Sequence, residues 1–206
     1  MIKTIIFDLG GVIITLDQPQ AVRRFKELGL TDAEKQLDAY TQRGIFGDLE
    51  RGTITPEEFR VGLSTLIGHE VSYDGCCYAW QGYAKEVPQR NLDTLRRLRQ
   101  KGYRLVLLSN TNYYMMQWVM SEAFDGQGHS IADYMDACYL SYEMKVMKPD
   151  EQFFRRVIEV EGLVPEEALF VDDGPRNVAA ASKLGLHTFS PENGEDWTQE
   201  IYNYLT

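Results

Sequence analysis

Five short apolar runs, separated by stretches with helical periodicity, constrain the fold of this chain more than any other feature of its sequence. Residues 2–7 are mostly β-branched or aromatic and do not alternate with polar residues, which is typical of a strand buried on both faces of a parallel sheet. Glycine directly follows several of the helical stretches, where helices commonly end. Strands that alternate with helices of about ten residues predict a doubly wound α/β fold with a mostly parallel sheet. The predicted strands are residues 2–7, 103–108, 137–140, 168–171 and 186–189, and the predicted helices are residues 92–101, 151–161, 177–184 and 196–204.

Residues 15–87 interrupt this alternation, because we find no strand there and only amphipathic helical stretches. Thr55 and Pro56 mark the clearest helix start, since threonine is a good N-cap and proline suits the first helical position. A helical insert directly after the first strand lies at the carboxyl edge of the sheet, where open α/β folds bind ligands. We therefore predict an α/β core domain formed by residues 1–14 and 88–206, and an all-helical cap domain formed by residues 15–87. The predicted cap helices are residues 20–28, 32–44, 56–66 and 73–85.

The charge of the chain limits its partners. A formal net charge of −10 over 206 residues argues against nucleic acid or an anionic membrane as a partner, because both are negatively charged. An anionic small substrate would need local attraction from a metal ion, backbone N–H groups or a particular lysine. No obligate protein partner is evident from the sequence.

Cysteine usage and the N-terminal run indicate the compartment. Cys76, Cys77 and Cys138 form an odd set without CxxC spacing, so neither a disulfide framework nor a zinc site is expected. The apolar N-terminal run is short and is split by Lys3 and Asp8, unlike a signal peptide. No window approaches the ~18 apolar residues of a membrane span. We therefore expect a cytoplasmic protein.

A single carboxylate, Asp8, ends the first predicted strand within the run IIFDLGGVII. In a parallel sheet this end of the strand lies at the ligand-binding edge. Gly10 and Gly11 allow a tight turn that brings backbone N–H groups close to an anion. Taken alone, the segment also fits an ordinary turn with an aspartate cap.

Polar residues follow the second predicted strand at the same edge. Ser109, Asn110, Thr111 and Asn112 offer hydroxyl, amide and N–H groups for phosphate oxygens, although such residues are also common helix N-caps.

Further charged residues precede and follow the fourth predicted strand. Lys148 stands before Pro149, whose ring favours an extended conformation at Lys148. Asp172 and Asp173 follow the strand directly, and two adjacent acids there suit Mg²⁺ as hard oxygen ligands. In a doubly wound sheet all these segments converge on one crevice, which favours one site over separate coincidences.

At this point the sequence resembles the haloacid dehalogenase-like hydrolase superfamily over essentially its whole length. The motifs of that family appear in order as Asp8-Leu9-Gly10-Gly11-Val12, then Ser109, then Lys148 with Pro149, then Asp172-Asp173. The insert at residues 15–87 is similar to the helical cap that one class of the family places after its first motif. Within it, LERGTI at 49–54 and PEEF at 56–59 resemble the bacterial sugar-phosphatase branch that includes α-glucose-1-phosphatase.

The resemblance implies a role for each acidic residue. Asp8 is expected to be a nucleophile that forms an aspartyl-phosphate, which splits hydrolysis into two easier displacements. Mg²⁺ is expected to bind Asp8, the backbone carbonyl of Gly10 and Asp173, with Asp172 in support.

The resemblance also implies which groups hold the phosphoryl oxygens. These are Ser109, the N–H groups of Leu9 and Asn110, and Lys148. Lys148 would also help to keep Asp8 ionised. The expected function is Mg²⁺-dependent hydrolysis of a small phosphorylated metabolite, with a sugar phosphate as the expected substrate.

Gly10 departs from the family pattern, because most phosphatases of the superfamily carry a second aspartate at that position as general acid and base. Such assistance is typically worth about 10²–10⁴ in rate. Asp17, at the start of the cap, is one candidate to replace it, and the alternative is that Asp17 caps the first cap helix. The sugar-phosphatase branch also shows a glycine here.

Two other functions remain open from the sequence. A 2-haloacid dehalogenase uses the same aspartate nucleophile without a metal, although Asp172-Asp173 is the metal-binding form of the last motif. A catalytically silent binding domain is the other alternative. Asn112 is a further site candidate, and four cap aromatics either line the substrate pocket or form the cap core. These aromatics are Phe46, Tyr78, Trp80 and Tyr83.

Overall fold

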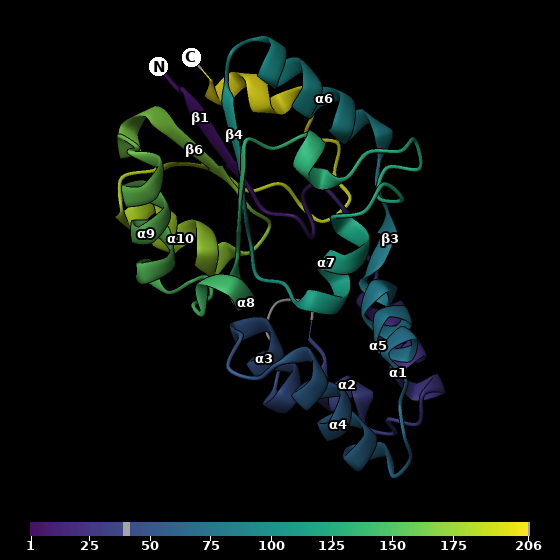
Figure 1. Cartoon of the computed structure of the whole chain (residues 1–206). Helices are drawn as coiled ribbons and strands as arrows, with labels where there is room; N and C mark the ends of the chain where they lie inside the picture. Colours follow the sequence, from purple (N-terminus) through teal and green to yellow (C-terminus); the bar gives the residue numbers. More distant parts are fainter. Residues whose placement is uncertain (39–41, 206) are drawn as a thin grey trace.

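A five-stranded parallel sheet forms the centre of the fold in this computed structural model, which describes all residues except 39–41 and 206 (Figure 1). The strands are β1 (Thr4–Phe7), β4 (Arg104–Ser109), β5 (Ala137–Leu140), β6 (Ala168–Val171) and β7 (His187–Phe189). Their order across the sheet is β5-β4-β1-β6-β7. The structure therefore confirms the predicted doubly wound α/β fold, with strand bounds that differ from the predicted ones by at most two residues.

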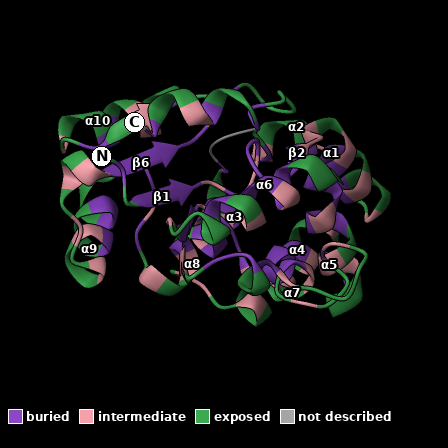
Figure 2. Cartoon of the chain, turned by 90° about the horizontal axis from the view of Figure 1, so that it is seen from above, coloured by how far each residue is buried: buried purple, intermediate pink, exposed green. Residues whose placement is uncertain are grey.

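Strand β1 lies in the middle of the sheet, and its neighbours are distant in sequence. Phe7 pairs with Leu107 of β4 on one side and with Val171 of β6 on the other. All four residues of β1 are buried, as the purple strands in Figure 2 show. The three strands thus end at nearly the same level, and the residues that follow them meet at one edge.

Helices cover both faces of the sheet. They are α6 (Gln89–Gln100), α9 (Glu151–Glu161) and α10 (Pro175–Lys183). On one face Ile5 and Phe7 share a hydrophobic cluster with α6 and with the 3-10 helix Glu200–Tyr204. On the other face Ile6 packs with side chains of α9 and α10. The continuous apolar run in β1 is explained by this double burial.

Two helices of the core were not predicted, and one predicted helix takes another form. Helices α7 (Tyr113–Val119) and α8 (Ser141–Met144) directly follow the ends of β4 and β5. The stretch at 196–204 was predicted as a helix, but only Glu200–Tyr204 is helical there and it is a 3-10 helix.

The described residues between β1 and α6 form five α-helices and one 3-10 helix, with a hydrophobic cluster formed mostly by this insert. The α-helices are α1 (Gln18–Glu27), α2 (Ala33–Gln36), α3 (Gly44–Arg51), α4 (Pro56–Ile67) and α5 (Tyr73–Trp80). The division of the chain into domains at residues 14/15 and 87/88 stays a prediction.

Three details of the predicted insert are wrong. The short strands β2 (Thr15–Leu16) and β3 (Ala84–Glu86) pair antiparallel where the chain enters and leaves the insert, although no strand was predicted there. The predicted helix 32–44 is helical only in α2 and at residue 44, and its residues 39–41 lie outside the described part of the chain. The predicted helix 73–85 ends at Trp80, because a 3-10 turn and β3 follow.

The C-terminal end of α3 connects the insert to the core through a hydrogen bond and a close backbone contact. The Ser141 hydroxyl, which is fully buried, donates to the carbonyl of Glu50 at 2.6 Å and accepts from the N–H of Thr111 at 3.0 Å. Gly52 ends α3 in the left-handed region, with φ of 69°. A Cβ at Gly52 would lie 2.0 Å from the carbonyl oxygen of Tyr142. Only glycine therefore fits this contact between α3 and α8.

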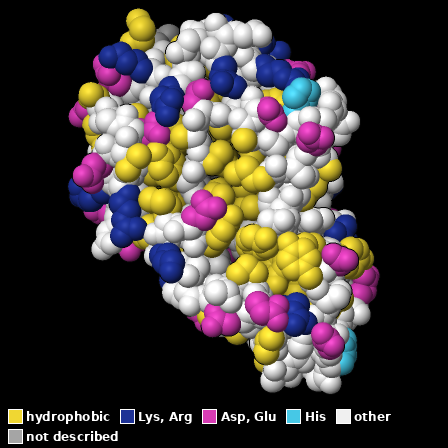
Figure 3. All heavy atoms as spheres, in the orientation of Figure 1, with side chains coloured by type: hydrophobic (Ala, Val, Ile, Leu, Met, Phe, Trp, Pro, Cys, Tyr) yellow, Lys and Arg dark blue, Asp and Glu magenta, His cyan; other side chains and the backbone are white. Residues whose placement is uncertain are grey.

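Charged side chains of both signs alternate around the face shown in Figure 3, and hydrophobic side chains gather toward its middle.

No helix among the described residues combines the length and the apolar character needed to cross a membrane.

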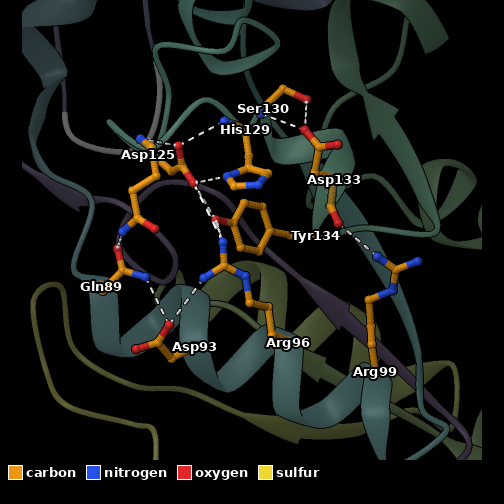
Figure 4. A network of polar contacts seen from close by, with 10 residues as sticks. Gln89, Asp93, Arg96, Arg99, Asp125, His129, Ser130, Asp133 and Tyr134 are labelled. Carbon is orange, nitrogen blue, oxygen red and sulfur yellow. Dashed lines mark hydrogen bonds and ion pairs between the residues drawn. The ribbon is translucent and has the colours of Figure 1, made fainter.

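A buried carboxylate holds the loop between α7 and β5 (Figure 4). The side chain of Asp125 is inaccessible to solvent and accepts hydrogen bonds from the Tyr134 hydroxyl at 2.6 Å and from the N–H of Gln127 at 2.7 Å. The His129 ring lies 2.8 Å away, and the Arg96 guanidinium lies at 3.8 Å. Burial alone would raise the pKa of Asp125, but these hydrogen bonds hold it well below its usual range.

We expect Gly52→Ala to destabilise the protein much more than Gly68→Ala. Both glycines end cap helices with positive φ, but a Cβ at Gly68 meets nothing within 4 Å. Gly68→Ala should lower the free energy of unfolding by about 1 kcal/mol through backbone strain. Gly52→Ala adds the clash with Tyr142 and should lose about 1–3 kcal/mol more. Urea unfolding measures both, and equal losses would contradict the proposed close contact.

We expect Asp125→Asn to lower the free energy of unfolding by about 1–3 kcal/mol near pH 7, because it weakens a buried charged network. A carboxyl group with a lowered pKa in the folded state stabilises the fold above its unfolded pKa, and this contribution is lost as the pH falls. The difference between the two proteins should therefore be complete at pH 7 and shrink below about pH 4. Urea unfolding near pH 7 and near pH 3 measures it, and a constant difference would speak against the assigned network.

Candidate active site

Asp8 follows β1 and is fixed by backbone contacts. Its N–H donates to the carbonyl of Val171 at 2.9 Å, and its Oδ1 accepts from the N–H of Leu9 at 2.7 Å. The side chain is 13% exposed. The second oxygen, Oδ2, faces a buried lysine.

Lys148 is fully buried, and three acceptors surround its ammonium group. Nζ lies 3.0 Å from Asp8 Oδ2 and 2.6 Å from Asp172 Oδ2, and it donates to the carbonyl of Leu108 at 2.8 Å. Burial alone would lower the pKa of Lys148, but the two carboxylates raise it above its usual value. An ammonium group has three N–H donors, so Lys148 binds a phosphoryl oxygen only by exchanging one of these contacts.

The side chain of Asn110 holds the backbone of Lys148. Its Nδ2 donates to the Lys148 carbonyl at 2.8 Å, and its Oδ1 accepts from the Lys148 N–H at 2.9 Å. The sequence predicted that Asn110 binds phosphate oxygens and did not predict that it holds Lys148. The structure adds this positioning function for its amide, which spacing along the chain does not reveal.

Asp8, Asp172 and Asp173 form the one group of possible metal ligands found in the described part of the chain, with ligand atoms within 4.8 Å of one another. Asp172 is held by the N–H of Gly174 at 2.8 Å and by the amide of Asn177 at 3.0 Å. Three carboxylates so close repel one another unless a cation compensates them. Oxygen ligands of this kind suit Mg²⁺, so the residues present fit that ion.

Burial, and to a smaller extent the neighbouring carboxylates, raises the pKa values of Asp8 and Asp173. Burial raises the pKa of Asp8 to about 8, and the lowering effect of Lys148 does not offset it. Burial and the neighbouring Asp172 raise the pKa of Asp173 to about 6. Lys148 therefore acts on Asp8 in the predicted direction, because it lowers the pKa that burial raises.

The two glycines after Asp8 are constrained differently. Gly11 has φ of 79°, and a Cβ there would lie 2.2 Å from an oxygen of Asp173, so only glycine fits beside the acidic cluster. A Cβ at Gly10 would lie 3.0 Å from a methyl group of Leu16. The space next to Gly10 is therefore taken by an apolar side chain. The predicted binding of a metal by the Gly10 carbonyl stays a prediction.

A cavity of about 80 Å³ lies between the loops after β1 and β4 and the insert. Leu9, Gly10, Ser109 and Asn110 line it on the core side. Ser109 ends β4, is buried, and donates its hydroxyl to the carbonyl of Asn110 at 3.4 Å. The structure thus brings the predicted phosphate-binding residues of the first two motifs to one cavity. The remaining lining residues are Ile14, Leu16, Gln42, Glu50, Trp80, Tyr83, Thr111, Asn112 and Met115.

Three of the four cap aromatics are core residues, two of these also line the cavity, and Tyr78 does neither. Phe46, Trp80 and Tyr83 are all buried in the hydrophobic cluster of the insert, and Trp80 and Tyr83 also line the cavity. Tyr78 is 45% exposed, and its hydroxyl donates to Glu27 at 2.7 Å.

Asp17 and Asn112 both cap helices. Asp17 Oδ1 accepts from the N–H of Gln20 at 2.9 Å at the start of α1, and Asp17 is not among the residues that line the cavity. The alternative that Asp17 caps the first cap helix is therefore the one that the structure shows. Asn112 Oδ1 accepts from the N–H of Met115 at 3.1 Å, and Asn112 also lines the cavity.

Sequence analysis missed one acid that lines the cavity, Glu50 of α3. It is 7% exposed, and burial raises its pKa to about 8. A signal was present, because Phe46, Leu49 and Glu50 have the i, i+3, i+4 spacing of the apolar face of a helix. Spacing alone does not tell whether such an acid is buried with a partner or lies at the edge of the packed face in contact with solvent.

Residues 2–185 match the haloacid dehalogenase-like hydrolase family. The chain is 45% identical over 201 residues to the D-ribitol-5-phosphate phosphatase of Bacteroides thetaiotaomicron, and the match covers 98% of this chain and 97% of the relative.

Two solved structures have the same fold over nearly their whole lengths. One is a HAD-like family hydrolase from Porphyromonas gingivalis, with 44% identity, a TM-score of 0.95, and coverage of 100% of this chain and 98% of that one. The other is a HAD family enzyme from Bacteroides thetaiotaomicron in complex with magnesium and inorganic phosphate, with 39% identity, a TM-score of 0.89, and coverage of 98% and 100%. With the acidic cluster at the carboxyl end of β1 and this match over most of its length, the chain belongs to the haloacid dehalogenase-like hydrolase family.

Proposed function

We propose that this protein is a Mg²⁺-dependent phosphatase that hydrolyses a small polyol or sugar phosphate through an aspartyl-phosphate on Asp8. The observation that carries the proposal is the cluster of Asp8, Lys148, Asp172 and Asp173 at the carboxyl end of β1. Its fit to Mg²⁺ and phosphate is supported by the relative whose structure contains both.

Asp8 is placed to act as the nucleophile. An oxygen of Asp8 attacks phosphorus, a new P–O bond forms, and the ester P–O bond breaks as the alkoxide leaves and takes a proton from water. Water then attacks the aspartyl-phosphate, which releases inorganic phosphate and restores the Asp8 carboxylate. The hydrogen bond from the N–H of Leu9 keeps one oxygen of Asp8 in a fixed direction.

The surrounding residues hold the reacting groups. Asp8, Asp173 and the Gly10 carbonyl would bind Mg²⁺, with Asp172 in support, and the ion would neutralise charge on the phosphoryl oxygens. Ser109, the N–H groups of Leu9 and Asn110, and Lys148 would bind these oxygens as charge redistributes.

The substrate class is supported by the relative that acts on D-ribitol 5-phosphate. A cavity of about 80 Å³, lined by both polar and apolar residues, suits a short hydroxylated carbon chain better than a large apolar one. Neither a dehalogenase nor a silent binding domain needs the acidic pair, so the pair favours the phosphatase over both. A cytoplasmic location and the absence of nucleic-acid and obligate protein partners stay predictions.

We expect Asp8→Asn to reduce hydrolysis of D-ribitol 5-phosphate by at least about 10³-fold, because an amide oxygen is a poor nucleophile. Phosphate release with Mg²⁺ measures the rate, and circular dichroism verifies the fold. Asp17→Asn is the matched control, because asparagine also caps helices, and it should leave the rate unchanged. More than a tenth of the activity left in Asp8→Asn would rule out the nucleophile. Halide release from a 2-haloacid by the unchanged protein would favour the dehalogenase.

We expect Mg²⁺ to stabilise the folded protein, because it relieves the repulsion among the three carboxylates. At 100 times its Kd the ion contributes about 2.7 kcal/mol, which corresponds to a rise in Tm of roughly 5–10 °C for a chain of this size. Thermal unfolding with Mg²⁺ and with EDTA measures the rise. Asp173→Asn should abolish most of it, whereas the exposed Asp74→Asn should keep it. A rise of the same size in both variants would place the ion elsewhere.

A further inference from the structure

Glu50 is the one carboxylic acid among the described residues that line the cavity. It lies on α3 of the insert, and Leu9, Gly10, Ser109 and Asn110 line the core side of the same cavity. A substrate whose phosphate lies against those residues extends its carbon chain toward the insert. Glu50 is therefore placed to meet the part of the substrate that is not the phosphate.

The Glu50 carboxyl interacts with the side chain of Asn112, which lowers its pKa. Asn112 uses its oxygen to cap α7, so it offers its NH₂ group to Glu50. Glu50 is buried and lines the cavity, so an occupant of the cavity that both donates and accepts hydrogen bonds can bind its carboxyl group directly.

We propose that the Glu50 carboxyl binds a hydroxyl group of the substrate's carbon chain and thereby selects polyol phosphates over phosphates of apolar chains. The inference rests on the proposed phosphatase function and names the residue that selects its substrate class.

The charges around Glu50 favour a neutral hydroxyl over an ammonium group as its ligand. Burial raises the pKa of Glu50 to about 8, against smaller lowering effects of Asn112 and Arg51. Arg51 is on the same helix, with its side chain half exposed, and Tyr83 faces Glu50 from the end of the insert. At neutral pH the carboxyl is mostly protonated, so it donates one hydrogen bond and accepts others. A secondary alcohol does the same.

The position of Glu50 is fixed by its own backbone. Ser141 binds the Glu50 carbonyl at 2.6 Å and is itself bound to Thr111, which also lines the cavity. Two residues after Glu50, Gly52 packs against the backbone of Tyr142. A carboxyl group held this way recognises a hydroxyl without first losing side-chain and helix freedom.

The test compares two substrates with similar alkoxide leaving groups and equal chain length. D-ribitol 5-phosphate carries hydroxyl groups along its chain, and pentyl phosphate carries none. Glu50→Leu should lower kcat/KM for D-ribitol 5-phosphate by about 10–100-fold and leave that for pentyl phosphate within about threefold of the unchanged protein. Glu50→Gln keeps a donor and an acceptor and should restore most of the preference. Asp48→Asn, on the same helix with a half-exposed side chain, is the matched control and should behave as the unchanged protein.

A parallel fall for both substrates would overturn the inference, because Glu50 would then act on the leaving group or hold the fold. No change for either substrate would also overturn it.

Calorimetric binding of the two phosphates to Mg²⁺-loaded Asp8→Asn, with and without Glu50→Leu, gives a second readout that needs no turnover. Tighter binding of D-ribitol 5-phosphate that depends on Glu50 supports the inference. Equal binding of both phosphates refutes it while the phosphatase function stands. No hydrolysis of either phosphate by the unchanged protein would refute the proposed function itself.

Discussion

The buried ammonium group of Lys148 is the contact on which the site depends. It lies between Asp8, which follows β1, and Asp172, which follows β6, and it also donates to the end of β4 through Leu108. A buried charge is tolerated only when it is paired and hydrogen-bonded, so each of these groups requires the others. Asn110 fixes the backbone of Lys148 from the β4 side. The ends of three strands are thus joined by one cation.

This arrangement follows from the position of β1. The strand lies between β4 and β6, and its register places Phe7 beside Leu107 and Val171. The residues that follow β1 therefore meet those that follow β4 and β6, although about 100 residues or more of sequence separate β1 from either strand. Glycine at position 11 lets Asp173 approach the loop after β1, which brings the third carboxylate into the cluster. The order of the strands places the acidic residues at one edge of the sheet, and the missing side chain at Gly11 lets Asp173 approach the loop after β1.

The elements that could be predicted from the sequence are those with a clear pattern of burial or helical periodicity. The elements that could not are short, or they depend on how the insert docks on the core. The strands of the central sheet could be predicted because both of their faces are buried. The acidic cluster could be predicted because Asp8 follows β1, and Asp172 and Asp173 follow β6. Helix α7 was missed because its capping residue Asn112 also fits a phosphate-binding loop. Strands β2 and β3 have two and three residues, too few for a pattern. Helix α3 begins with Gly44 and contains Gly47, both poor helix formers, so its local signal is low.

Glu50 shows why such residues escape a reading of the sequence alone. Its spacing placed it on an apolar face, but only the contact of α3 with α8 decides that this face closes over the cavity. The hydrogen bond from Ser141 and the close approach at Gly52 fix the backbone of α3 at Glu50 and Gly52, and burial of the Glu50 carboxyl group raises its pKa. The docking of α3 on α8 therefore places Glu50 at the cavity, and the selection proposed for Glu50 depends on this contact.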